Sequence, residues 1–143
     1  MAIGVQVTID CADPQRLSEF WAAALGYQLQ PPPPGYDSWE QFATDKGIPP
    51  ERWNDFGAVV DPDGRGPRLF FQRVPEPKQV KNRVHIDIRA SRGAPEAEKQ
   101  TRQDEVASRL IAAGASLVDR MPGMTGGSHL VMRDPEGNEF CVT

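Results

Sequence analysis

The chain has few of the features that mark several large classes of protein. It has two cysteines, Cys11 and Cys141, far apart and with no CxxC pair, so a disulfide framework is not expected. No apolar run approaches bilayer length, and the start, MAIGVQVTIDCADP, has no basic stretch leading into an apolar core. The net charge of −4 argues against nucleic acid or an anionic membrane as a partner. We therefore predict a cytoplasmic protein that binds neither.

The first half of the 143-residue chain reads as a strand followed by a helix. Apolar residues alternate with polar ones in IGVQVTI (3–9), which is the period of a strand with one buried face. Asp13 followed by Pro14 is a typical helix start, with aspartate as N-cap and proline at the first helical position. Gly26 comes directly after the apolar stripe of that helix and predicts its end.

A hairpin and then a second copy of the same pattern follow. The apolar runs 58–60 and 68–74 flank DPDGRGP, a turn-rich connection. VHIDIRA (84–90) alternates as the first strand does, Pro95 begins a second helix, and HLVMRDPEGNEFCV (129–142) echoes the hairpin. The spacing between matching features is not constant, so we predict a duplicated βαβββ unit with insertions: residues 1–77 and 78–143.

An insertion at 31–56, PPPPGYDSWEQFATDKGIPPERWNDF, makes the first half longer. Asp37 or Ser38 is expected to cap a short helix in which Trp39 and Phe42 share a face. Its aromatic residues either anchor the insertion onto the domain or form a lid whose rings stack on a planar ligand.

The sequence resembles the vicinal oxygen chelate (VOC) superfamily, in particular its glyoxalase-like, bleomycin-resistance-type domains. The residues that carry this resemblance lie at 7–29, 66–78, 82–90 and 133–142, so it spans most of the chain. It implies an α+β fold in which two βαβββ units form a curled mixed sheet around a concave cavity, within a single domain. It also implies a homodimer, in which the partner is a second copy of the chain.

Relatives that act on substrates hold a divalent metal at four inward-facing strand positions, which the resemblance places here at Gln6, Gln72, His85 and Cys141. Carboxylates are expected at two of these positions, and Gln72 and Cys141 stand there instead. This loss removes the negative charge that holds the ion and the base that a glyoxalase I reaction needs. Asp87, Glu139 or a Cys141 thiolate offer a replacement. We nevertheless predict no metal and no other cofactor.

The predicted ligand is a small hydrophobic or aromatic molecule in the concave cavity. The candidate contacts are Gln6, Trp39, Phe42, Trp53, Phe70, Gln72, His85, Glu139 and Cys141. The alternative is an enzyme of the lyase, isomerase or dioxygenase type, not an ordinary glyoxalase I, that uses His85 and Asp87 as catalytic residues or recruits a metal. His85 also has a plainer interpretation, as a polar wall residue hydrogen-bonded to Asp87, to Gln6 or to a ligand.

Overall fold

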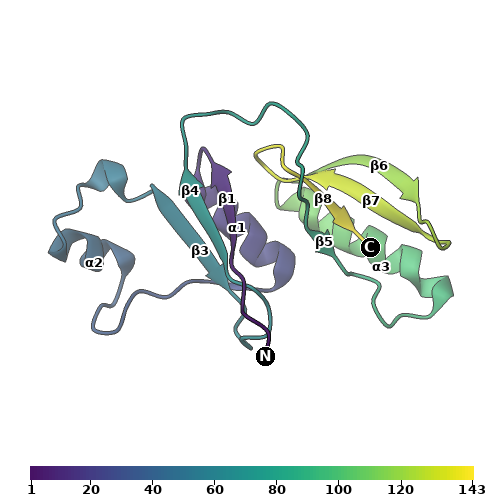
Figure 1. The fold of residues 1–143 in the computed structure, drawn as a ribbon, viewed down its shortest axis with the longest axis horizontal. Coiled ribbons are helices and arrows are strands. Elements are labelled where there is room, and N and C mark those ends of the chain that lie inside the picture. Colours follow the sequence, from purple (N-terminus) through teal and green to yellow (C-terminus); the bar gives the residue numbers. More distant parts are fainter. The chain divides into compact units, whose positions relative to one another are not determined.

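A computed structural model describes residues 1–143 and divides them into two compact units, Met1–Pro77 (unit 1) and Lys78–Thr143 (unit 2). Each unit contains one four-stranded mixed sheet and a long helix, so the chain is α+β (Figure 1). No helix is both long enough and apolar enough to cross a membrane.

Unit 1 has a sheet in the order β1-β4-β3-β2, with β1 parallel to β4 and the other pairs antiparallel. Its elements are β1 (Val7–Cys11), α1 (Pro14–Leu25), β2 (Gln28–Leu29), α2 (Trp39–Asp45), the 3-10 helix η1 (Pro50–Arg52), β3 (Phe56–Val60) and β4 (Leu69–Arg73). The long helix α1 packs on one face of this sheet and leaves the other face to polar and aromatic side chains.

The predicted ends of α1 are confirmed. The Asp13 side chain accepts a hydrogen bond from the backbone N–H of Arg16, and Pro14 is the first helical residue. Gly26 ends the helix in the left-handed conformation, with φ of 68°. The buried core between α1 and the sheet consists mainly of Leu17, Phe20, Trp21, Val59, Leu69 and Phe71.

The helix α1 and the strand β3 approach each other most closely at Gly57. A Cβ atom at this position would lie 2.3 Å from Ser18 Oγ and 2.9 Å from the carbonyl oxygen of Pro14. The Ser18 hydroxyl already donates to that carbonyl, at 2.6 Å. Only glycine leaves room for this contact without displacing backbone.

Unit 2 repeats this topology, with sheet order β5-β8-β7-β6 and a parallel β5–β8 pair. Its elements are β5 (Asp87–Ile88), α3 (Glu96–Ala112), β6 (Ser116–Pro122), β7 (Ser128–Arg133) and β8 (Glu139–Val142). The helix α3 begins after Pro95, as predicted, and buries Ala107 and Leu110. The β7–β8 turn is held by Asp134, whose Oδ1 accepts from the backbone N–H groups of Glu136 and Asn138.

Two predicted strands are shorter than the alternation indicated. The first begins at Val7 rather than Ile3, and only Asp87 and Ile88 of 84–90 belong to a strand. Val84 is 83% exposed, so apolar alternation there does not mark a buried face. Apolar alternation becomes a strand only where a neighbouring strand supplies hydrogen bonds. The strand β1 begins at Val7 because Val7 pairs with Leu69, which is the first residue of the partner strand β4.

Candidate functional site

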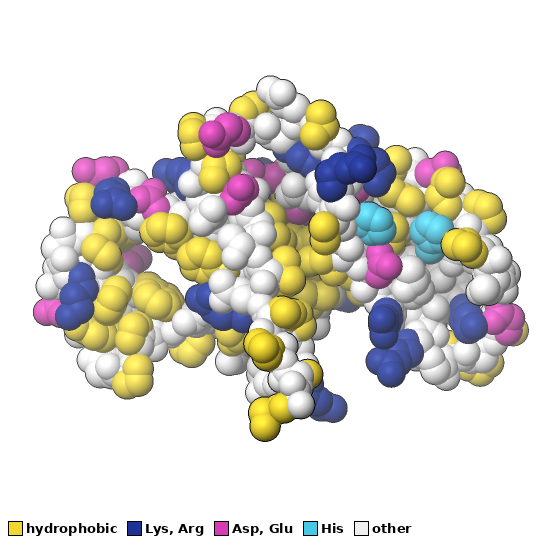
Figure 2. All heavy atoms as spheres, in the orientation of Figure 1, with side chains coloured by type: hydrophobic (Ala, Val, Ile, Leu, Met, Phe, Trp, Pro, Cys, Tyr) yellow, Lys and Arg dark blue, Asp and Glu magenta, His cyan; other side chains and the backbone are white.

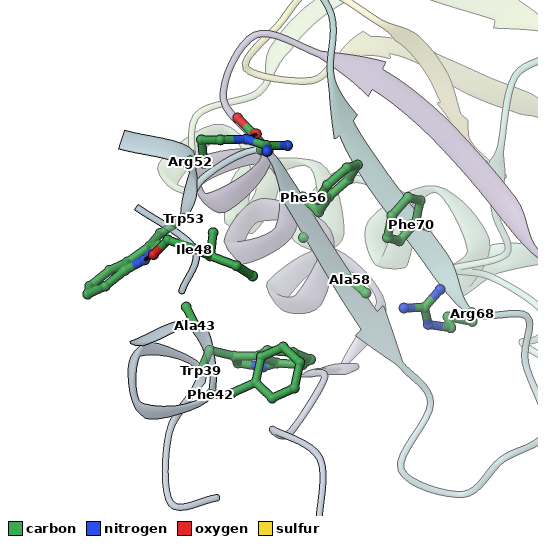
Figure 3. A pocket seen from close by; sticks show the side chains of 12 residues that line it. Trp39, Phe42, Ala43, Ile48, Arg52, Trp53, Phe56, Ala58, Arg68 and Phe70 are labelled. Carbon is green, nitrogen blue, oxygen red and sulfur yellow. Dashed lines mark hydrogen bonds and ion pairs between the residues drawn. The ribbon is translucent and has the colours of Figure 1, made fainter. Parts of the chain in front are cut away.

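An aromatic pocket lies between the insertion and the open face of the unit 1 sheet. Its volume is about 270 Å³, near the lower end of the roughly 300–1,000 Å³ of small-molecule sites. Figure 3 shows Phe56 and Phe70 side by side on β3 and β4, Trp39 and Phe42 grouped on α2, and Arg68 just before the start of β4. The lining residues are Trp39, Phe42, Ala43, Ile48, Arg52, Trp53, Asp55, Phe56, Gly57, Ala58, Arg68 and Phe70.

The insertion side of this aromatic pocket is held by local capping and by indole hydrogen bonds. Ser38 caps α2 by accepting from the backbone N–H of Gln41, as predicted. The Trp39 and Phe42 rings meet edge to face, with centroids 5.6 Å apart. Trp39 Nε1 donates to the Gln30 carbonyl at 2.7 Å, so the helix is tied to the sheet edge beside β3.

The sheet side of the pocket is an apolar ladder across β3 and β4. Ala58 lies opposite Phe70 in the strand register, and Phe56 lies opposite Gln72. The Phe56 and Phe70 rings stack with centroids 5.7 Å apart, although Phe56 is 57% exposed. Exposed, preordered rings of this kind offer a planar surface to a ligand ring.

A donor cluster, His85, Asp87 and Cys141, lies in unit 2. Its candidate ligand atoms all lie within 4.8 Å of one another. Asp87 and Cys141 are partners in the β5–β8 register, and His85 Nδ1 is 3.1 Å from Asp87 Oδ1. The predicted contact between His85 and Asp87 is thus present. Figure 2 shows the two histidines of the chain close to an acidic side chain on one face of unit 2.

Cys141 and Glu139 lie two residues apart on the same face of β8, and their pKa values are shifted in opposite directions. Burial raises the pKa of the Cys141 thiol, and the negative charge of Asp87 raises it further, so the thiol is a poor nucleophile. Glu139 accepts from the backbone N–H of Asn82 at 2.9 Å and pairs with Lys78 at 3.1 Å. The Asn82 hydrogen bond and the Lys78 charge lower the pKa of Glu139 to about 2. Its carboxylate therefore anchors the segment leading into β5.

Strand register shows which positions of the two units correspond. Val59 pairs with Leu69 near the Asp61 turn, and Met132 pairs with Phe140 near the equivalent Asp134 turn. Leu69 thus corresponds to Phe140, and the next residues along, Phe70 and Cys141, correspond as well. Their partners in the parallel pairs, Thr8 and Asp87, agree with this assignment.

The counterpart of Cys141 is therefore Phe70, and not Gln72 as the sequence spacing indicated. The turn between β3 and β4 is longer than the one between β7 and β8, which displaced the assignment by two residues. Gln72 instead donates to Asp10 Oδ1 at 2.7 Å across β1 and β4. By the same register Gln6 corresponds to His85, and Arg68 corresponds to Glu139.

These contacts test whether the residues suit the divalent metal that the fold implies. In unit 1 the two positions are Gln6 and Phe70, and Gln6 Oε1 accepts from the Arg68 guanidinium at 2.6 Å. A phenyl ring and an amide next to a cation do not suit a metal ion. In unit 2 an imidazole, a carboxylate and a thiol do suit a zinc-like ion. The four family positions taken together therefore do not suit a divalent metal ion, whereas the three residues of the donor cluster do.

The structure brings Trp39, Phe42, Trp53 and Phe70 together in the aromatic pocket, and His85, Asp87 and Cys141 in the donor cluster. Gln72 lies on the same sheet face as the pocket, and Gln6 lies just before β1, but neither lines the pocket. Sequence reasoning missed Arg68 and Ile48 as pocket residues, and it placed Phe56 only among the aromatic residues of the insertion. Arg68 lies two residues before Phe70, so the alternation of a strand places both on the same face, and this signal could have identified Arg68.

Several solved structures share the fold of this chain. A glyoxalase/bleomycin resistance/dioxygenase family enzyme from Burkholderia phytofirmans PsJN is 17% identical, with a TM-score of 0.60 over 96% of this chain and 94% of that one. A possible glyoxalase from Bacillus cereus is 17% identical, with a TM-score of 0.60 over 99% of both chains. A mutant of the fosfomycin resistance protein FosX from Listeria monocytogenes, complexed with Mn(II) and a dihydroxypropylphosphonic acid, is 14% identical, with a TM-score of 0.61 over 99% of this chain and 90% of that one.

The chain shares the fold of these proteins, and with the family model this confirms the resemblance to the VOC superfamily found in the sequence. A family model described as a glyoxalase-like domain matches residues 6–143, so the chain belongs to the glyoxalase-like domain family. No curated protein matches the sequence.

Proposed function

We propose that the protein binds a small, planar hydrophobic molecule in the aromatic pocket of unit 1, without a metal. The observation that carries this proposal is the stacked Phe56–Phe70 pair, which faces Trp39 and Phe42 across a volume of about 270 Å³. Trp39 is 45% exposed and Phe56 is 57% exposed, so a ligand ring between them would remove apolar surface from water. Pairing with a second copy of the chain stays a prediction.

Calorimetric titration of the full chain with 2-naphthoate tests this proposal. At about 0.3 kcal/mol for each of its roughly thirteen non-hydrogen atoms, binding of this probe should reach about 4 kcal/mol, or a Kd of about 1 mM or tighter. Cyclohexanecarboxylate has the same charge but no flat ring, so we expect it to bind several-fold more weakly. Equal affinity for both probes, or no heat from 2-naphthoate, would contradict a site for planar rings.

An enzyme acting through the donor cluster is the second candidate. The observation that favours it is the contact between His85 Nδ1 and Asp87 Oδ1, at 3.1 Å. With Nδ1–H donated to Asp87, His85 Nε2 would be free to take a proton from a substrate, as in a lyase or an isomerase. The neighbour FosX was solved with Mn(II), so a metal held by His85, Asp87 and Cys141 belongs to the same candidate.

Elemental analysis of protein purified without chelator tests the metal-dependent form of the second candidate. We expect far less than one divalent metal ion per chain, because unit 1 supplies no ligand and the raised pKa of Cys141 disfavours the thiolate. Near-stoichiometric zinc, nickel, iron or manganese that is lost in His85→Ala but kept in His129→Ala would contradict this expectation. It would favour the enzyme.

A further inference from the structure

Arg68 is a half-buried cation in the wall of the aromatic pocket. Its guanidinium carbon lies 5.0 Å from the centroid of the Phe70 ring, which in turn stacks on Phe56. Nε donates to Gln30 Oε1 and Nη1 donates to Gln6 Oε1, both at 2.6 Å. These contacts fix the planar guanidinium beside the rings, with Nη2 outside both hydrogen bonds.

The charge of Arg68 is not matched by an acid within unit 1. Both hydrogen-bond partners are neutral amides, and no carboxylate of unit 1 lies within ion-pair distance of it. The other charged residues of the pocket lining, Arg52 and Asp55, pair with each other at 2.9 Å. The lining therefore has one surplus positive charge, and it lies at Arg68.

The position in unit 2 that corresponds to Arg68 carries a charge that is neutralised by a counter-ion. Glu139, the counterpart of Arg68 in the register, pairs with Lys78 at 3.1 Å, and its side chain is only 12% exposed. A charged residue at this position thus has a counter-ion inside unit 2, whereas in unit 1 it has none. A partly buried cation without a counter-ion attracts an anion from solution, since hydrogen bonds from a guanidinium to a carboxylate are stronger than those from a guanidinium to neutral amides.

We propose that the ligand of the aromatic pocket is an anion: a planar ring that bears one carboxylate or similar anionic oxygen group bound by Arg68. This inference rests on the proposed function, because it names the chemical class of the ligand for the same pocket. The ring stacks on Phe70 and Phe56, and the anionic group replaces or adds to the glutamine amides at the guanidinium. Arginine suits this role because its fork binds a carboxylate through two parallel hydrogen bonds.

Paired titrations with 2-naphthoate and the neutral 2-naphthamide test this inference. The two probes share the ring system and differ in charge. We expect the native chain to prefer 2-naphthoate by about tenfold or more, and Arg68→Gln to bring the two affinities to within about twofold of each other by weakening 2-naphthoate alone. Arg68→Lys, which keeps the charge without the fork, should retain an intermediate preference.

The matched control is Arg65→Gln, which removes the same charge from the β3–β4 turn, where Arg65 pairs with Asp63 outside the pocket. It should leave the preference unchanged, and thermal unfolding should show that all variants fold. Equal binding of both probes to the native chain would overturn the inference and leave the proposed function intact. An equal loss in Arg68→Gln and Arg65→Gln would also overturn it. Binding of neither probe would overturn both proposals.

Discussion

Replacing Gly57 with alanine is expected to lower the free energy of unfolding of unit 1 by about 3 kcal/mol. The new Cβ would lie 2.3 Å from Ser18 Oγ and 2.9 Å from the Pro14 carbonyl oxygen. Rotating the Ser18 hydroxyl away relieves the first clash but gives up its hydrogen bond to Pro14. The second clash involves backbone, so α1 and β3 must move apart and open the core around Trp21 and Val59.

Urea unfolding followed by circular dichroism measures this effect. Gly4→Ala is the matched control, because a Cβ there meets nothing within 4 Å and should change stability by less than about 0.5 kcal/mol. Because the chain has two compact units, we expect it to unfold in two steps. All three tryptophans lie in unit 1, so the loss should fall on the step in which tryptophan fluorescence changes. Equal stability of the two variants would mean that the α1–β3 contact is looser than described.

Replacing Trp39 with alanine is expected to weaken binding of 2-naphthoate by about 10- to 30-fold. The substitution removes the ring that faces Phe56 and Phe70 across the pocket. It also removes the hydrogen bond from Nε1 to the Gln30 carbonyl, so α2 loses its tie to the sheet edge. The remaining lining would then be more open to water, and the ligand would bury less surface.

Two further variants separate these contributions to affinity. Trp39→Phe keeps an aromatic face without the hydrogen bond and should lose only a few-fold in affinity. Leu117→Ala removes an apolar side chain of unit 2 that is 52% exposed, comparable to Trp39, and should have no effect. Titration calorimetry gives the three affinities, and a Trp39→Ala variant with native affinity would remove this residue from the site.

Local signals in the sequence predicted the elements of the fold well. Asp13, Pro14 and Gly26 act within a single turn of helix, so their effect does not depend on distant residues. The same holds for the Ser38 cap of α2 and for the two turns that begin with Asp61 and Asp134. The duplicated order of strands and helix follows from these signals and from the alternation of apolar residues.

Strand ends and register could not be predicted in the same way, because they depend on partners far away in the chain. Ile3 and Val5 continue the alternation of β1 but lie exposed outside it. Because the turn before β4 is longer, sequence spacing placed the second of the four metal positions at Gln72, while the register gives Phe70. The role of Arg68 depends on side-chain contacts with Gln6 and Gln30, which no spacing rule indicates.

The correspondence between Arg68 and Glu139 has a consequence for how the two halves can diverge. If they descend from one duplicated segment, a single ladder position now carries opposite charges, with a cation beside stacked rings in one copy and a neutralised anion in the other. The aromatic pocket is built wholly from residues of unit 1 and the donor cluster wholly from residues of unit 2. In the two functions proposed above, the ligand contacts and the proton- or metal-binding groups would therefore come from different copies of the duplicated segment. Ligand preference and chemistry would then be separate targets for selection or for engineering.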